Sequence, residues 1–138
     1  LWMMDDQGMS AEEITQVLYR ESGLKGLSGM TNDMRTLLAS EAPEAAEAVE
    51  YFVTRVAQEV ASMAAALGGI DALVFTGGIG ENAAPIRARV LEALGFLGFV
   101  LDPEANEAGD ERISSNLPAL VLQTNEELVI ARAVRAAL

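Results

Sequence analysis

An apolar run that stops at closely spaced glycines constrains the fold of this chain more than any other stretch. Ala72 to Phe75 contains β-branched and aromatic side chains, which is the composition of a strand buried on both faces. The glycines that stop it are Gly77, Gly78 and Gly80. From Asn82 onward the apolar residues follow one helix face, at Ile86, Val90, Leu91 and Leu94. A strand, a glycine turn and a helix start bring bare backbone N–H groups against a phosphate or a nucleotide.

The length and composition are typical of one globular unit: 138 residues, of which 51% are hydrophobic and 22% charged. No apolar stretch is long enough for a membrane span. The first residues lack the basic and apolar segments of a secretory signal. We therefore expect a cytoplasmic protein without membrane contact.

Charge and residue usage exclude several classes of function. The net charge of -12 argues against extended contact with nucleic acid or an anionic membrane surface. The sequence contains no cysteine and no histidine, which removes thiolate chemistry, Ser-His-Asp catalysis and the commonest zinc sites. Chemistry in this chain would depend on carboxylates, arginines, backbone amides and hard cations.

Local patterns predict the other elements. Ser10 and Glu13 form the capping box of a helix that should end near Gly23, and Pro43 opens a long helix that ends at Leu67. The remaining expectations are an ordered loop over 22–35, a helix over about 83–94, a strand over 96–101, a solvated loop over 102–112, a strand over 118–123, and a last helix with a capping box of Thr124 and Glu127. This order indicates an α/β unit with at least two parallel strands and with ligands at their carboxyl ends.

Two further positions have a structural and a functional interpretation. Asp33 and Arg35 flank one residue, and an isolated pair of this kind is usually a surface ion pair or a helix cap. Glu126 and Glu127 lie in a predicted first turn, where the helix dipole favours carboxylates and a metal-binding role is the alternative.

Three separated motifs together resemble one family, the acetate kinase family of acetate and propionate kinases. They are SGMTNDMR at 28–35, VFTGGIGEN at 74–82 and TNEELVIA at 124–131, with GFLG at 95–98 between the last two. A glycine-rich turn alone would be weak support, but the ordered set is specific and covers essentially the whole chain.

The resemblance implies a fold and a place in it. Family members have a duplicated ribonuclease H-like fold, in which ATP lies between two domains. Residues 1–138 would be a single segment, the later part of the C-terminal nucleotide-binding domain, with parallel strands flanked by helices. The N-terminal domain would be absent, and the complete enzyme is expected to be a homodimer.

The resemblance also assigns roles to residues. Asp33, Met34 and Arg35 would lie against the adenosine part of ATP or ADP. Gly78, Ile79, Gly80, Glu81 and Asn82 would form the main adenine and ribose loop, in which glycines permit positive φ, Ile79 covers a base and Asn82 caps the next helix. Glu126 would be the Mg²⁺-site glutamate, acting through a water.

The function implied is transfer of the ATP γ-phosphoryl group to acetate, which gives acetyl phosphate and ADP. The family's catalytic residues lie upstream of Leu1, so none is expected in this segment and the segment alone should be inactive. Alternatives are a propionate kinase, or a non-catalytic remnant that binds nucleotide or self-associates.

Overall fold

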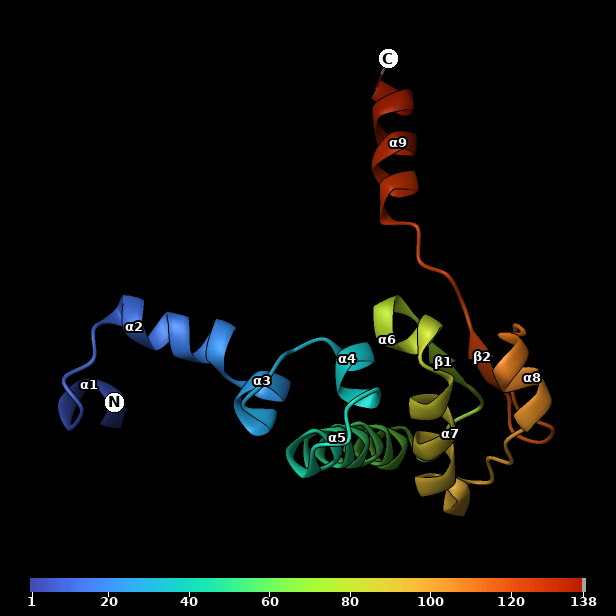
Figure 1. Ribbon diagram of the computed structural model, residues 1–138. Helices are drawn as coiled ribbons and strands as arrows, with labels where there is room; N and C mark the ends of the chain where they lie inside the picture. Colours follow the sequence, from blue (N-terminus) through green and yellow to red (C-terminus); the bar gives the residue numbers. More distant parts are fainter. Residues whose placement is uncertain (138) are drawn as a thin grey trace. The chain divides into compact units, whose positions relative to one another are not determined.

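The computed structural model describes residues 1–137, and the side chains of residues 126, 136 and 137 lie outside the described part. The chain divides into two compact units, Leu1–Arg55 and Val56–Leu138. In chain order the elements are α1 (Trp2–Asp5), α2 (Ala11–Gln16), the π-helix η1 (Val17–Glu21), α3 (Gly23–Ser28), α4 (Met34–Leu38), α5 (Pro43–Leu67), β1 (Leu73–Phe75), α6 (Gly77–Asn82), α7 (Ala84–Ala93), the 3₁₀ turn η2 (Gly95–Leu97), α8 (Pro103–Ala108), β2 (Ala119–Val121) and α9 (Glu126–Ala137) (Figure 1).

The first unit is helical. The capping box predicted at its start is present, because Glu13 N donates to Ser10 Oγ at 3.2 Å and Ser10 N donates to Glu13 Oε2 at 2.8 Å. The predicted loop over 22–35 instead contains the helix α3, which ends at Gly29 with φ 65°. The buried apolar side chains of this unit are Met34, Leu37, Ala45, Ala48, Val49 and Val53.

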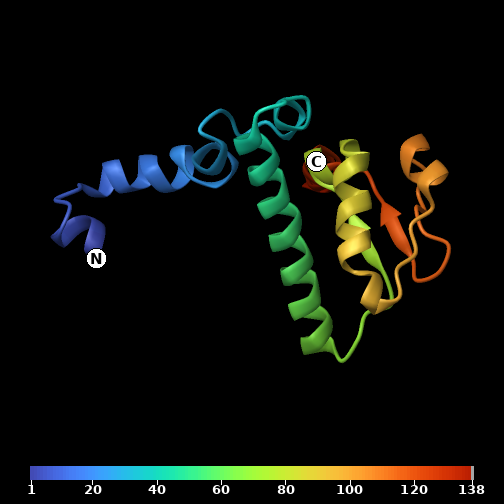
Figure 2. The same ribbon diagram turned by 60° about the horizontal axis from the view of Figure 1, so that its bottom comes forward.

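The second unit contains a two-stranded parallel sheet. Leu73 pairs with Ala119, Val74 with Leu120 and Phe75 with Val121. α7 lies beside the two strands and α8 lies beyond β2 (Figure 2). Buried apolar residues of α7 and its neighbours form the core of this unit: Phe75, Ala83, Ile86, Val90, Leu91, Leu94, Phe99, Ile113 and Ala119. The parallel pair places the carboxyl ends of both strands at one edge of the sheet, next to α6.

Several predicted elements differ from the structure. Val74 is 47% exposed, so the expectation of a strand buried on both faces was wrong for this chain. The strand predicted over 96–101 is the short turn η2 followed by Gly98 at φ 102°, a backbone angle that interrupts an extended run. Part of the predicted solvated loop is the helix α8, which Asp102 caps by accepting from Ala105 N at 3.1 Å. No helix in the described part combines the length and the apolar character that a membrane crossing requires.

Candidate functional site

The glycine segment, residues 77–82, is a short helix rather than an open turn. α6 begins at Gly77 directly after Thr76, which is extended at φ -152° and ψ 172°. Gly77 has φ 70°, a left-handed conformation that favours glycine at the exit from β1. Gly78 and Gly80 do not have positive φ. The predicted loop glycines, Gly78 and Gly80, therefore do not use the positive φ that glycine permits, and Gly77 just before them does.

The other two glycines have different surroundings. A Cβ built on Gly80 would lie 3.2 Å from the carbonyl carbon of Phe75 and 3.4 Å from its Cα. Gly80 thus lets α6 approach the backbone of β1 closely. A Cβ on Gly78 would meet no other atom within 4 Å, and Gly78 is exposed. The packing of this chain therefore gives no reason for a glycine at position 78.

Glu81 links the ends of the two strands. Its Oε1 accepts hydrogen bonds from Gly77 N at 2.8 Å, Thr124 N at 3.1 Å, Thr124 Oγ1 at 3.2 Å and Thr76 Oγ1 at 3.5 Å. Thr76 follows β1 and Thr124 lies shortly after β2, so one carboxylate joins both carboxyl ends. The backbone N–H donors of Thr124 and Gly77, in that order, are the main reason that the pKa of Glu81 lies below its ordinary value.

Asn82 does not cap α7 as predicted. Its Nδ2 donates to Gly78 O at 2.9 Å, within α6. The N-cap position of α7 is Ala83, which has no side-chain hydrogen bond to the helix, and Pro85 lies in the first turn. Asn82 therefore stabilises the glycine segment itself, and the prediction that it caps the following helix was wrong.

Arg87, which lies outside the predicted set, also binds the segment, and Asn106 binds Arg87. Arg87 Nη1 donates to Gly80 O at 3.1 Å and to Glu81 O at 2.9 Å. On its other side, Nε donates to Asn106 Oδ1 and Nη2 to Asn106 O, each at 2.8 Å. Arg87 and Asn106 are both 2% exposed. The sequence signal that could have placed Asn106 on a helix is Asp102 followed by Pro103, a cap and first-turn pair.

Asp33, Met34 and Arg35 belong to the first unit. Asp33 is the N-cap of α4, since its Oδ1 accepts from Arg35 N at 3.1 Å and its Oδ2 from Thr36 Oγ1 at 2.8 Å. The pKa of Asp33 is lowered by the Thr36 hydroxyl and then by the Arg35 backbone amide. Met34 is 4% exposed, so it offers a ligand very little accessible surface in this structure. The helix-cap interpretation of Asp33 is confirmed, and its contact with adenosine stays a prediction.

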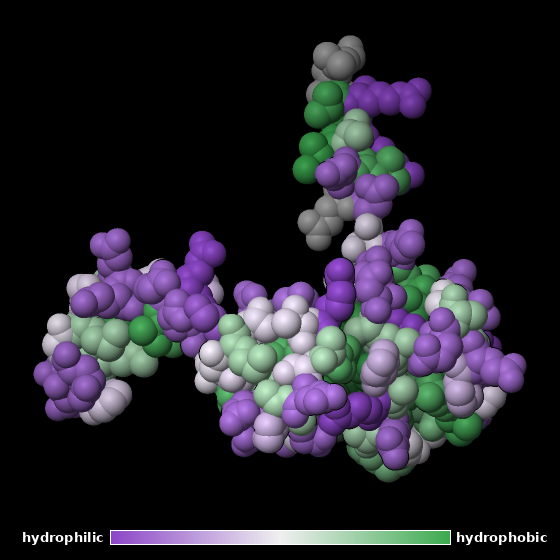
Figure 3. Space-filling model, in the orientation of Figure 1, coloured by the Kyte–Doolittle hydropathy of each residue, from purple (hydrophilic) through white to green (hydrophobic). Residues whose placement is uncertain are grey.

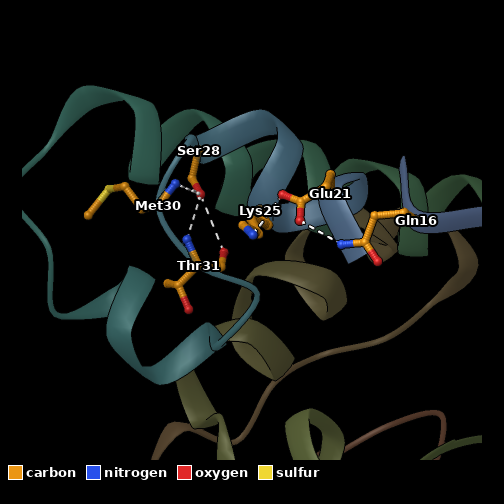
Figure 4. Close-up of polar contacts among 6 residues, drawn as sticks. All are labelled: Gln16, Glu21, Lys25, Ser28, Met30 and Thr31. Atoms are coloured by element: carbon orange, nitrogen blue, oxygen red, sulfur yellow. Dashed lines mark hydrogen bonds and ion pairs between the residues drawn. The ribbon is translucent and has the colours of Figure 1, made fainter. Parts of the chain in front are cut away.

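Ser28 fixes the loop that leads to α4. This side chain is 4% exposed, and its Oγ accepts from Met30 N at 3.1 Å and Thr31 N at 3.4 Å while donating to Thr31 O at 3.3 Å (Figure 4). The same figure shows the Lys25 and Glu21 ion pair at 2.7 Å, which lies upstream of that loop. The motif at 28–35 therefore has an ordered backbone of its own.

The start of α9 differs from the predicted capping box. Leu128 N donates to Asn125 Oδ1 at 2.9 Å, so Asn125 is the capping side chain. Thr124 binds Glu81 instead. Glu126 begins α9, but its side chain, on which the Mg²⁺ prediction depends, lies outside the described residues. Within the described part, no group of three or more acidic side chains is arranged to hold a metal ion.

The second unit thus brings together the glycine segment and the start of α9. The family model described as the Acetokinase family matches residues 1–132. The chain belongs to this family.

Named relatives agree with the acetokinase assignment. The acetate kinase of Rhodopseudomonas palustris (strain TIE-1) is 55% identical, with 97% of this chain and 35% of that protein covered. The acetate kinase of Rickettsia felis is 43% identical, with 97% of this chain and 36% of that protein covered. The chain therefore spans about a third of the length of the curated relatives it matches.

Solved structures confirm the predicted fold class. A propionate kinase from Francisella tularensis has a TM-score of 0.86 and 43% identity, with 95% of this chain and 35% of that chain covered. The acetate kinase of Porphyromonas gingivalis also has a TM-score of 0.86, with 32% identity and coverage of 98% and 36%. The α/β arrangement is that of the corresponding part of these kinases, as expected for the later part of a ribonuclease H-like domain.

Proposed function

We propose that this chain is the adenosine-binding portion of an acetate kinase-type phosphotransferase. The complete enzyme would transfer the γ-phosphoryl group of ATP to acetate, giving acetyl phosphate and ADP, in the cytoplasm and as a homodimer. Propionate is the alternative acceptor, since the relatives include both kinds of kinase. The observation that carries the proposal is Gly78, an exposed helical glycine at the carboxyl edge of the sheet.

Gly78 has no structural reason to be glycine. Its φ is not positive, and among the described residues a Cβ there would meet nothing outside α6 itself. Glycine inside a helix costs about 0.8–1.0 kcal/mol relative to alanine. We propose that a ligand approaches the bare backbone here, and the flat face of a base is the ligand that the family suggests. Ile79, half-buried beside it, would cover that base.

The Mg²⁺ role fits the donors that the chain offers. Magnesium in kinases is held by one or two carboxylates together with substrate phosphates and waters, not by an all-protein cage. Glu126 would be such a single carboxylate, at the start of a helix that Thr124 and Glu81 tie to the glycine segment. The ion would supply charge neutralisation at the phosphates of the nucleotide.

Calorimetric titration of ADP with Mg²⁺ into wild type, Gly78→Ala and Gly95→Ala tests the nucleotide site. Gly95 is a matched control, because a Cβ there also meets nothing, its φ is not positive, and it lies at the far end of α7, about 15 Å of helix away. We expect Gly78→Ala to weaken ADP binding about tenfold and Gly95→Ala to leave it unchanged. Equal affinity of all three proteins would contradict the proposal.

Activity is a separate test. The purified chain mixed with ATP and acetate, with acetyl phosphate trapped by hydroxylamine, should give no product, because we propose that the catalytic residues lie in the portion of the enzyme beyond this segment. Product formation would contradict this part of the proposal.

The second candidate is a self-associating remnant, and exposed apolar side chains favour it. Val129 is 68% exposed, Ile130 65% and Val134 56%, all on α9, where Figure 3 shows green, apolar surface next to purple. Sedimentation combined with ADP titration distinguishes it: ADP binding, in a monomer or a dimer, favours the kinase segment, whereas association without ADP binding favours the remnant.

A further inference from the structure

Arg87 is a buried cation whose described hydrogen bonds all go to neutral oxygens. It donates hydrogen bonds to two backbone carbonyls of the glycine segment and to the side-chain and main-chain oxygens of Asn106. Asn106 in turn donates from Nδ2 to Ala84 O at 3.0 Å, at the start of α7. Removing a guanidinium from water is costly, and burial lowers the pKa of Arg87. Such a residue needs a reason for its position.

The reason lies at the C-terminal end of α6. A helix leaves its last four carbonyls without partners, and in a six-residue helix these are most of the carbonyls. Arg87 satisfies two of them, at Gly80 and Glu81. Arginine can do this because its rigid planar fork presents five donors in fixed directions. Lysine carries the same charge but cannot reach both carbonyls and Asn106 together.

We propose that Arg87, oriented by Asn106, is a positioning residue that holds the glycine segment in the shape that receives the nucleotide. This inference rests on the proposed function. Glu81 anchors the segment at Gly77 and Thr124, and Arg87 anchors its other end from the interior of the second unit. With both ends fixed, Gly78 and Ile79 remain as the free surface.

A simple packing role for Arg87 predicts something different. If it only joined α7 to α8, its loss would loosen both helices about equally. Because two of its bonds end on residues 80 and 81, our proposal predicts a loss confined to the glycine segment. The matched control is Arg112, an exposed arginine of the same unit that also binds backbone carbonyls, with Nε on Ser114 O at 3.0 Å and Nη2 on Asn116 O at 2.7 Å.

The test compares wild type, Arg87→Lys and Arg112→Lys by hydrogen exchange and by ADP titration with Mg²⁺. In Arg87→Lys we expect exchange over residues 76–83 to accelerate about tenfold, with residues 84–93 changed less than about twofold. ADP affinity should fall about tenfold, and Arg112→Lys should change neither quantity. If Arg87→Lys loses its far-UV helical signal, Asn106→Ala replaces it. The same acceleration over residues 76–83 is expected, and the first turn of α7, where Ala84 O loses its bond from Asn106 Nδ2, is left out of the comparison.

Two results would overturn the inference. One is unchanged exchange over residues 76–83 in Arg87→Lys, and the other is equal acceleration across α6, α7 and α8. If the wild-type chain binds no ADP, the nucleotide role of this segment fails together with the proposed function. The exchange measurement then still decides whether Arg87 holds the segment, so the two failures are distinguishable.

Discussion

Because α6 lies close to β1 at Gly80, we expect a larger side chain at this position to lower the stability of the fold. An added methyl group would lie 3.2 Å from the carbonyl carbon of Phe75 and 3.4 Å from its Cα, closer than ordinary van der Waals contact. Both of these atoms belong to the backbone, so they cannot move aside as a flexible side chain could. Overpacking of this kind costs about 1–3 kcal/mol. The higher helix propensity of alanine offsets this cost by about 0.8–1.0 kcal/mol relative to glycine. We therefore expect Gly80→Ala to destabilise the second unit by about 1 kcal/mol.

Gly78→Ala provides the comparison that isolates the steric cost. It brings the same gain in helix propensity without any contact, so it should stabilise by up to about 1 kcal/mol. Subtracting the free-energy change of Gly78→Ala from that of Gly80→Ala cancels the contribution of helix propensity. The free energies of unfolding of the two variants should therefore differ by about 2 kcal/mol, within the overpacking range. With a urea m-value of about 2 kcal/mol per M, the midpoints would differ by about 1 M.

The assay is urea unfolding followed by far-UV circular dichroism. Hydrogen exchange of residues 84–93 assigns the transition to the second unit. If the two variants unfold within about 0.5 kcal/mol of each other, the size of an ordinary surface effect, α6 does not pack against Phe75 as described. In that case the structural reason given for Gly80 is refuted.

Three further predictions concern the polar contacts around the site. Because the folded-state pKa of Glu81 lies below the ordinary 4.5, its bonds stabilise at higher pH and are lost as the pH falls through that lower value. Wild type should thus exceed Glu81→Gln in stability at neutral pH and lose that advantage in acid, as measured by urea unfolding at several pH values. Asn125→Ala should lower the stability of α9 by about 1 kcal/mol and reduce its circular dichroism signal at 222 nm. Asn125→Asp should keep both the stability and the signal of wild type. Asp33→Ala should accelerate amide exchange in α4, whereas Asp33→Asn should leave the exchange rate at its wild-type value. If the cap is the only role of Asp33, Asp33→Asn should also leave ADP affinity unchanged.

Elements with strong local signals could be predicted from the sequence. The helix from Pro43 to Leu67 has the predicted bounds, and the strands at Leu73–Phe75 and Ala119–Val121 lie inside the predicted runs. The parallel pairing followed from the order of helices and strands alone. In each case propensity, capping and periodicity favour one structure, so tertiary contacts had little to override.

The errors occur where distant contacts decide the structure. Three glycines among four residues oppose a helix, yet the segment is helical because Glu81 binds the Gly77 amide and Arg87 binds the last carbonyls. The acidic run after Asp102 was expected to be solvated. The burial of Asn106 depends on Arg87, which lies 19 residues earlier in the chain. No local pattern contains such information, although the cap at Asp102 could have indicated α8.

The three glycines of α6 separate what the fold requires from what a ligand requires. Gly77 is explained by its left-handed backbone and Gly80 by its distance from Phe75. The sequence makes these residues look alike, and only the structure removes two of them from the argument for nucleotide contact. Glu81 is also engaged, since its Oε1 serves four protein donors. The family motif therefore contains residues whose identity the fold explains, and under our proposal Gly78 and the neighbouring Ile79 are the leading candidates for nucleotide contact.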